Sequence, residues 1–212
     1  MAEIRVNTTG TLKLYENDNT SYIQIASPSS LGANRTITLP DADVTLASGT
    51  MATTNGITEA DNWRLTSGLA APTTAAAITA NLERVDSVSD KVGTGMSESS
   101  GVFTFPSTGI WLIRINAKWA YAGNDVAVQT SIYATTNNAD YTEVAMSHEA
   151  ITQIASSTTR AMGMCEILLD VASTTNTKVK FYSGSDSGAA GILEGDTNKN
   201  RTTMMFLRIG DT

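Results

Sequence analysis

Few residues in the sequence have the types and spacing that catalysis needs. His148 is the single histidine, so a site with several histidine ligands cannot form, and a histidine-based triad would depend on this residue alone. Its surroundings, AMSHEA, favour a turn or surface position. Cys165 is the single cysteine and lies in the apolar run CEILLDV, which favours a buried thiol over a reactive one. We therefore expect no catalytic residue, no enzymatic activity and no internal disulfide.

Motifs for nucleotide and metal binding are also missing. The stretches GTGMSES and GSDSGAAG have neither the spacing of a phosphate-binding loop nor that of a dinucleotide fingerprint. Two acidic groups, Asp41 with Asp43 and Asp186 with Glu194 and Asp196, lack the ligand spacing of a calcium loop. We expect no cofactor and no metal, with a calcium ion at an acidic loop as the open alternative.

Aromatic side chains near loops and strand ends are the remaining candidates for ligand contacts. Tyr121 in YAGND, Tyr141 in NNADYTE and Asp186 are the residues we expect to contact a surface glycan, if one is bound. An ordinary exposed tyrosine is the alternative for each of the two tyrosines. The other aromatic residues in such places are Trp119, Tyr133 and Tyr182, of which Trp119 is expected in the core.

Composition favours a β protein that binds neither nucleic acid nor membrane. Charged residues make up 17% of the 212 residues, and Thr, Ser, Ala, Asn and Gly are frequent, which favours short strands and turns over long surface helices. The net charge of −7 provides no positive field for nucleic acid or an anionic membrane. The opening MAEIRVNTTG lacks the features of a secretion signal, and no apolar run is long enough to span a bilayer, so we expect a soluble chain that is made in the cytosol.

The first part of the chain has short alternating segments separated by turn formers. Each segment carries only a pair of apolar residues on one face, and such a thin ribbon needs another surface to cover it. We predict that residues 1–52 form an N-terminal β-hairpin module that anchors the protein. The predicted anchoring residues are Leu12, Leu14, Ile23, Ile25, Ile37 and Leu39.

Residues 53–80 are rich in Ala, Gly, Ser and Thr, and this composition predicts a linker in which Trp63 is an anchoring residue. A helix is conceivable only at residues 74–85, although Pro72 and the flanking threonines weaken it.

Longer strands follow in residues 81–212 and predict an antiparallel sandwich. In SGVFTFPSTGIWLIRINAKW, alternation puts an apolar series from Trp111 to Trp119 on the inner face, whereas the other face begins apolar and becomes polar. The last strand, TTMMFLRIG, is also apolar on both faces. This excess favours an oligomer, and the predicted interface residues are Ile110, Leu112, Met205 and Leu207. The alternative is that the N-terminal ribbon or residues 47–80 cover these faces within one subunit.

The segment GVFTFPSTGIWLIRI and the closing NKNRTTMMFLRIG resemble the jelly-roll heads of the tumour necrosis factor (TNF) superfamily and of the first complement component. The shared signal is Phe-x-x-Pro-x-x-Gly-Ile-aromatic, here Phe103, Pro106, Gly109, Ile110 and Trp111. The resemblance covers residues 81–211 and implies a ten-stranded sandwich that forms a homotrimer. The expected fold class is thus all-β, with a small N-terminal β module and a C-terminal antiparallel jelly-roll sandwich.

A second resemblance covers nearly the whole chain and includes IRVNTTGTLKLYE, ANRTITLPDADVTL and the junction GTGMSESSGVFTFPSTG. These stretches look like modules in structural proteins of tailed bacteriophages, particularly marine ones, including fibre and decoration proteins. This resemblance implies a non-enzymatic protein on the virion surface. A homotrimeric capsid decoration or head-fibre protein bound to the major capsid protein is favoured, because the chain has no long repetitive shaft. The alternatives are a tail fibre or receptor-binding tip held by a tail protein, and a carbohydrate-binding module for host attachment.

Overall fold

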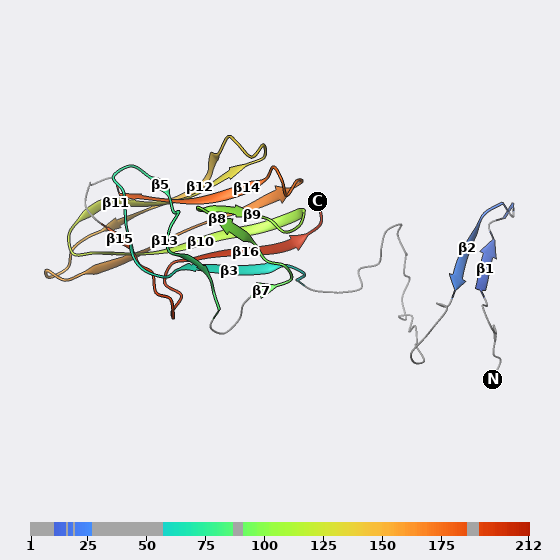
Figure 1. Cartoon of the computed structure of the whole chain (residues 1–212), viewed down its shortest axis with the longest axis horizontal. Helices are drawn as coiled ribbons and strands as arrows, with labels where there is room; N and C mark the ends of the chain where they lie inside the picture. The colour runs from blue at the N-terminus through green and yellow to red at the C-terminus, as the bar shows by residue number, and fades with distance from the viewer. Residues whose placement is uncertain (1–10, 16, 19, 27–56, 87–90, 186–190) are drawn as a thin grey trace. The chain divides into compact units, whose positions relative to one another are not determined.

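The computed structural model describes residues 11–15, 17–18, 20–26, 57–86, 91–185 and 191–212, and every regular element within them is a β-strand (Figure 1). The chain divides into two compact units, Met1–Met51 and Ala52–Thr212.

The N-terminal unit contains an antiparallel hairpin of β1 (Thr11–Tyr15) and β2 (Tyr22–Ala26). These strands are the predicted segments TLKLY and YIQIA. In the register of this hairpin, Leu12 pairs with Ile25 and Leu14 with Ile23. Ile37 and Leu39, in the other predicted anchoring segment, lie outside the described residues.

The second unit contains two sheets, of which the first has eight strands among the described residues. Its long central strand is β10, with β13 on one side and β16 followed by β3 on the other. Shorter strands complete the edges. The members are β3 (Ala60–Leu65), β4 (Leu69–Ala70), β6 (Leu82–Arg84), β7 (Lys91–Val92), β10 (Gly109–Tyr121), β13 (Thr159–Val171), β15 (Ile192–Leu193) and β16 (Thr203–Gly210).

The second sheet has six strands among the described residues, and its main order is β12-β11-β14-β9-β8, with β5 also paired to β14. Its pairings are antiparallel, as are those of the first sheet. The members are β5 (Ala76–Ala77), β8 (Ser97–Ser99), β9 (Val102–Thr104), β11 (Asp125–Thr135), β12 (Thr142–Ile151) and β14 (Lys178–Ser185).

The core lies between the two sheets and follows the predicted alternation. Five side chains of β10 are 0% exposed, and so are Phe206 on β16 and Phe103 on β9. Phe206 contacts Phe181 of β14 with ring centroids 5.8 Å apart, which joins one sheet to the other. The predicted inner face of the segment is therefore confirmed; its residues are Trp111, Ile113, Ile115, Ala117 and Trp119.

Residues 53–80 are not a simple linker, so this prediction needs correction. Residues 60–65 form β3, which pairs with β16 over five residues and brings Trp63 and Leu65 into the core. The conceivable helix over 74–85 is also wrong, since this stretch contains β5 and β6. The sandwich thus begins well before residue 81, and the chain divides near Met51.

The backbone at the start of β10 requires a glycine at position 109. Its φ is 138°, and an added Cβ would lie 2.5 Å from the carbonyl oxygen of Gly210. Only glycine allows the first residue of β10 to approach the end of β16 so closely. The glycine of the Phe-x-x-Pro-x-x-Gly-Ile-aromatic signal therefore allows β10 to pair closely with the end of β16.

Candidate subunit interface

The face of the eight-stranded sheet that points away from the core carries an unusual amount of apolar surface. We call it the assembly face and define it by the outward residues of β13, β10 and β16. Its apolar members are Met162, Met164, Leu168, Ile110, Leu112, Met205 and Leu207.

Three leucines form one row across this face. Leu112 pairs with Leu168 on one side and with Leu207 on the other, and Leu207 pairs with Ala60 of β3. Because paired residues in a sheet point to the same side, the four side chains form a continuous apolar band perpendicular to the strands. Leu168 is 65% exposed, which makes it one of the most exposed large apolar residues in the described part of the chain.

The structure brings the four predicted interface residues together. Leu112 and Leu207 are paired, Ile110 precedes Leu112 on the same face of β10, and Met205 pairs with Arg114 beside them. All four side chains are half-buried.

Sequence reasoning missed the contribution of β13. Met162, 59% exposed, and Met164, 51% exposed, lie on the same face as Leu168. The sequence signal for this contribution lies in MCEILLDV. Its alternate residues from Cys165 to Val171 are apolar and face the core, yet Met164 and Leu168 on the other side of the strand are apolar too. The assembly face therefore ends in a ridge of three exposed side chains on β13.

A hollow lies at the edge of the assembly face that is farther from β13, where β16, β3 and β7 meet. Its volume is about 250 Å³. Its lining includes Met205 and Leu207 of β16 with Lys91 and Val92 of β7, and most of the lining surface is apolar. The full lining is Ala60, Asp61, Asn62, Lys91, Val92, Met205, Phe206 and Leu207.

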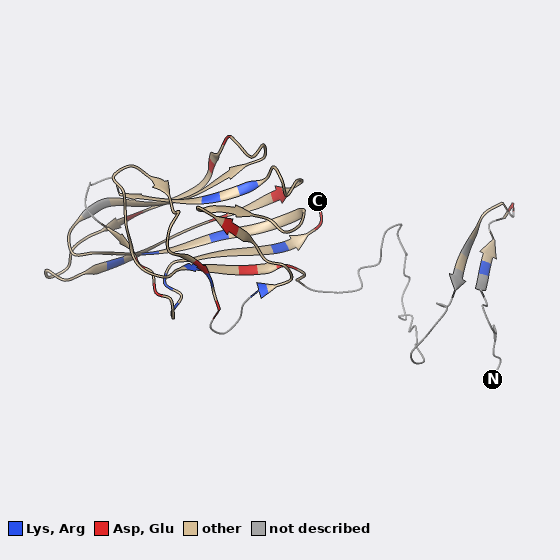
Figure 2. Ribbon diagram, viewed as in Figure 1, with Lys and Arg blue, Asp and Glu red and all other residues tan. Residues whose placement is uncertain are grey.

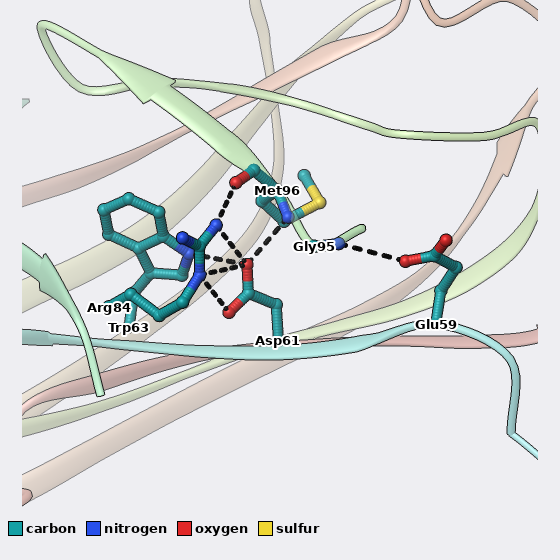
Figure 3. Close-up of polar contacts among 6 residues, drawn as sticks. All are labelled: Glu59, Asp61, Trp63, Arg84, Gly95 and Met96. Carbon is teal, nitrogen blue, oxygen red and sulfur yellow. Dashed lines mark hydrogen bonds and ion pairs between the residues drawn. The ribbon is translucent and has the colours of Figure 1, made fainter. Parts of the chain in front are cut away.

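A buried carboxylate holds the strands around this hollow (Figure 3). Asp61 is 3% exposed and accepts hydrogen bonds from Trp63 Nε1 at 3.0 Å and from the backbone N–H of Met96 at 2.7 Å. Arg84 Nε donates to Asp61 Oδ1 at 3.0 Å, and its guanidinium lies 4.9 Å from the Trp63 ring centroid. Because all these donors converge on one carboxylate, β3 and β6 are fixed together with the backbone at Met96.

The adjoining loop is attached in the same way. Glu59 accepts a hydrogen bond from the backbone N–H of Gly95 at 3.1 Å, as Figure 3 also shows. The segment that leads from β7 to β8 is thus bound at two consecutive residues, Gly95 and Met96.

The assembly face becomes polar along β10 from Arg114 toward Lys118. Arg114 donates to Glu166 across the β10–β13 pair, with Nη2 2.6 Å from Oε2. Further along, Glu194 is surrounded by three cations, Lys118 at 3.3 Å, Arg160 at 3.2 Å and Arg201 at 3.2 Å. Burial raises the pKa of Glu194, but the contacts from Lys118 and Arg160 outweigh it and leave this pKa below its usual value.

No single-sign field dominates the second unit, because basic and acidic residues are interspersed over its strands (Figure 2). In the described part of the chain, no group of three or more His, Cys, Asp or Glu side chains could hold a metal ion. Asp196 pairs with Arg201 and accepts a hydrogen bond from the backbone of Asn198.

The predicted glycan residues do not form one site. Tyr121 ends β10 in the eight-stranded sheet and packs partly against the core, whereas Tyr141 directly precedes β12 in the six-stranded sheet. Asp186 lies outside the described residues. The structure instead places the Tyr141 ring centroid 4.0 Å from the ammonium of Lys180 on β14, and Lys180 pairs in register with Tyr133 of β11.

The two residues with nucleophile or base chemistry are separate. Cys165 is 7% exposed, and burial raises its pKa to about 11. His148 is exposed on β12 and pairs in register with Gln129 of β11.

Within the described residues, no helix is long and apolar enough to cross a membrane.

Comparison with known proteins identifies the fold only. No family model and no curated protein matches the chain. Among solved structures, the Eiger TNF of S. frugiperda is similar with a TM-score of 0.50 and 7% identity, over 72% of this chain and 93% of that chain. Murine APRIL at pH 5.0 has a TM-score of 0.49 and 8% identity, over 71% of this chain and 98% of that chain. The second unit is thus an antiparallel sandwich with a TNF-like jelly-roll fold, as predicted, but its two sheets have eight and six strands among the described residues instead of the ten that the resemblance implies.

Proposed function

We propose that this chain is a non-enzymatic structural protein that forms a homotrimer through its assembly face. The observation that carries this proposal is the leucine row, which crosses three strands and ends in the exposed Leu168. Contiguous apolar surface of this kind is typical of protein interfaces. Charged residues would be expected in its place if the sheet faced water in the mature assembly.

The ridge and the hollow suggest how two copies meet. The exposed side chains of β13 lie at one side of the face, and the hollow beside Met205 and Leu207 lies at the other. A ridge that enters the hollow of the next copy gives a head-to-tail contact, which closes into a ring when the rotation allows it. The resemblance to TNF superfamily heads favours closure at three subunits.

The place of the trimer is proposed from the first part of the sequence. The stretch ANRTITLPDADVTL resembles modules of tailed-phage structural proteins, and residues 1–51 are a compact unit separate from the sandwich. We propose that this unit attaches the trimer to a virion. The major capsid protein is the favoured partner and a tail protein is the alternative.

The mass of the purified full chain in solution tests the trimer directly. Light scattering should give three times the chain mass of 22.4 kDa. A concentration-independent monomer would contradict the use of the assembly face, and a dimer would contradict the ring of three. Cryo-electron microscopy of virions that contain this chain tests its place: density on the capsid supports decoration, whereas density confined to the tail supports the alternative.

A further inference from the structure

The outer face of the six-stranded sheet carries a cluster of tyrosines from separate segments. Tyr133 of β11 and Tyr182 of β14 stack with ring centroids 4.0 Å apart and planes 26° from parallel. Tyr141, just before β12, lies under the ammonium of Lys180, which is 4.0 Å from its ring centroid. We call Tyr133, Tyr141 and Tyr182 the tyrosine cluster. Among the described residues, none of its rings contacts an aromatic ring outside the cluster.

Polar side chains lie between and beside these rings. The Tyr133 hydroxyl donates to Glu143 Oε2 at 2.8 Å, and Lys180 pairs in register with Tyr133. Gln129, two residues before Ser131 on β11, donates to the Ser131 hydroxyl at 2.9 Å. The surface therefore offers flat rings together with a carboxylate, an ammonium and an amide.

The cluster keeps its hydroxyls protonated. The hydrogen bond to Glu143, followed by burial, raises the pKa of Tyr133, and burial raises the pKa of Tyr141. Both hydroxyls are protonated at neutral pH, and the Tyr133 hydroxyl donates its single proton to Glu143. Each ring thus combines an apolar plane with a polar tip.

We propose that the tyrosine cluster is a binding site for a neutral saccharide. A pyranose ring has an apolar C–H face that packs on an aromatic ring, and a rim of hydroxyls that needs donors and acceptors. Tyr133 and Tyr182 supply the rings, while Glu143, Lys180 and Gln129 supply hydrogen bonds around them. Glu143 and Lys180 have opposite charges, and the chain has a net charge of −7, so acidic sugars are disfavoured.

A saccharide fits this surface better than a protein does. The strongly exposed large apolar side chains beside the cluster are Val144 and Met146, at 44% and 49% exposure, while the rings alternate with polar groups. A protein interface requires a larger apolar centre, such as the leucine row of the assembly face. The two surfaces lie on different sheets of the sandwich, so the saccharide site stays open when the assembly face is occupied.

A glycan array with the full chain tests the proposal. The array carries neutral glucose, galactose and mannose oligosaccharides beside sialylated and sulfated ones, and every neutral hit is then titrated by calorimetry. We expect saturable binding to a neutral probe and at least a tenfold loss of affinity in Tyr182→Ala. Tyr133→Phe retains the ring and removes the hydroxyl bond to Glu143, so it should also weaken binding even if Tyr182→Ala fails to fold. Tyr121→Ala, in the other sheet, is the matched control and should bind normally.

Three outcomes overturn the proposal: no neutral probe binds, only acidic probes bind, or binding is unchanged in both Tyr182→Ala and Tyr133→Phe. An empty array leaves a protein as the ligand of this surface. The proposal does not depend on the trimer, because a monomeric Leu168→Asp variant should bind the same probe with unchanged affinity per chain in solution. Failure of assembly and failure of saccharide binding are therefore distinguishable.

Discussion

Leu168 of β13 lies directly opposite Leu112 of β10 in the antiparallel register, and both side chains point away from the core. Alternate residues of β13 therefore fill the core of the sandwich, and the residues between them include apolar side chains on the outside of the sheet. Packing inside the second unit explains why the inward residues of β13 are apolar. It does not explain the apolar residues on the outward side, which are expected if this side contacts another subunit.

Replacing Leu168 with Asp should convert the proposed homotrimer to monomer. Burial of a leucine side chain contributes about 1.5–3 kcal/mol, and each copy in a ring would lose such a contact in addition to the cost of a buried charge. Light scattering over a dilution series measures the change. Val144→Asp is the control because Val144 is exposed in the other sheet, and its mass should not change. An oligomer that survives Leu168→Asp with the same dilution behaviour would place the interface elsewhere.

Replacing Asp61 with Asn should destabilise the sandwich by roughly 3 kcal/mol, because Arg84 would lose its buried partner. The carboxylate accepts from Trp63 Nε1 and the Met96 N–H at Oδ2 and from Arg84 Nε at Oδ1, so an amide in its place turns its own N–H donors toward at least one of these donors. The midpoint of urea unfolding gives the measurement. Asp211→Asn removes another carboxylate from an arginine, but Asp211 is 92% exposed, so this control should change stability by less than about 0.5 kcal/mol. Equal midpoints for the two variants would contradict the role of Asp61.

The β10 core could be predicted from sequence because strand alternation decides it within one segment. The same reasoning failed for residues 60–65, because the surrounding stretch is rich in Ala, Gly, Ser and Thr and the strand itself carries the charged residues Asp61 and Arg64. Their partners, Arg84 for Asp61 and Glu83 with Asp86 for Arg64, lie about twenty positions away, and only the fold brings them together.

Pairing between distant strands limited the site predictions in the same way. Ile110, Leu112, Met205 and Leu207 could be selected because each strand shows its own excess of apolar residues. Strand register decides which tyrosines meet, and register between β11 and β14 cannot be read from either strand alone. For this reason the sequence identifies Tyr133 and Tyr182 only as aromatics near strand ends, and it groups Tyr121 with Tyr141 although the two belong to different sheets.

The contribution of Glu194 to stability should depend on pH. Its pKa in the folded chain is below its usual value near 4.5, so the carboxylate stabilises the fold above that value and loses this effect as pH falls through the folded pKa. Thermal unfolding of the wild type and of Glu194→Gln between pH 7 and pH 3 measures it. The wild type should be more stable at pH 7, and the difference should shrink below about pH 4.5. A difference that is constant over the whole range would show that the carboxylate charge is not the cause.

Cys165 should resist thiol reagents in the native protein. Burial raises its pKa to about 11, so very little thiolate exists at pH 7.5, and the side chain is 7% exposed. Labelling with a chromogenic disulfide should be slow in buffer and rapid in urea. An added cysteine at an exposed position, His148→Cys, supplies the positive control in the same chain. Rapid native labelling of Cys165 in the wild type would mean that β13 opens readily from the sandwich.

Deletion of residues 1–51 should separate attachment from folding. Every residue of the described core cluster lies between Trp63 and Phe206, so the shortened chain retains the whole core and the assembly face. We therefore expect its unfolding midpoint and its number of subunits to match those of the full chain. Its incorporation into virions, measured by quantitative blotting of purified particles, should fall to background because the proposed anchoring residues are gone. The double substitution Leu12→Asp with Leu14→Asp should have the same effect in the full-length chain. If the shortened chain still bound particles, the sandwich itself would carry the attachment surface, and the N-terminal unit would need another role.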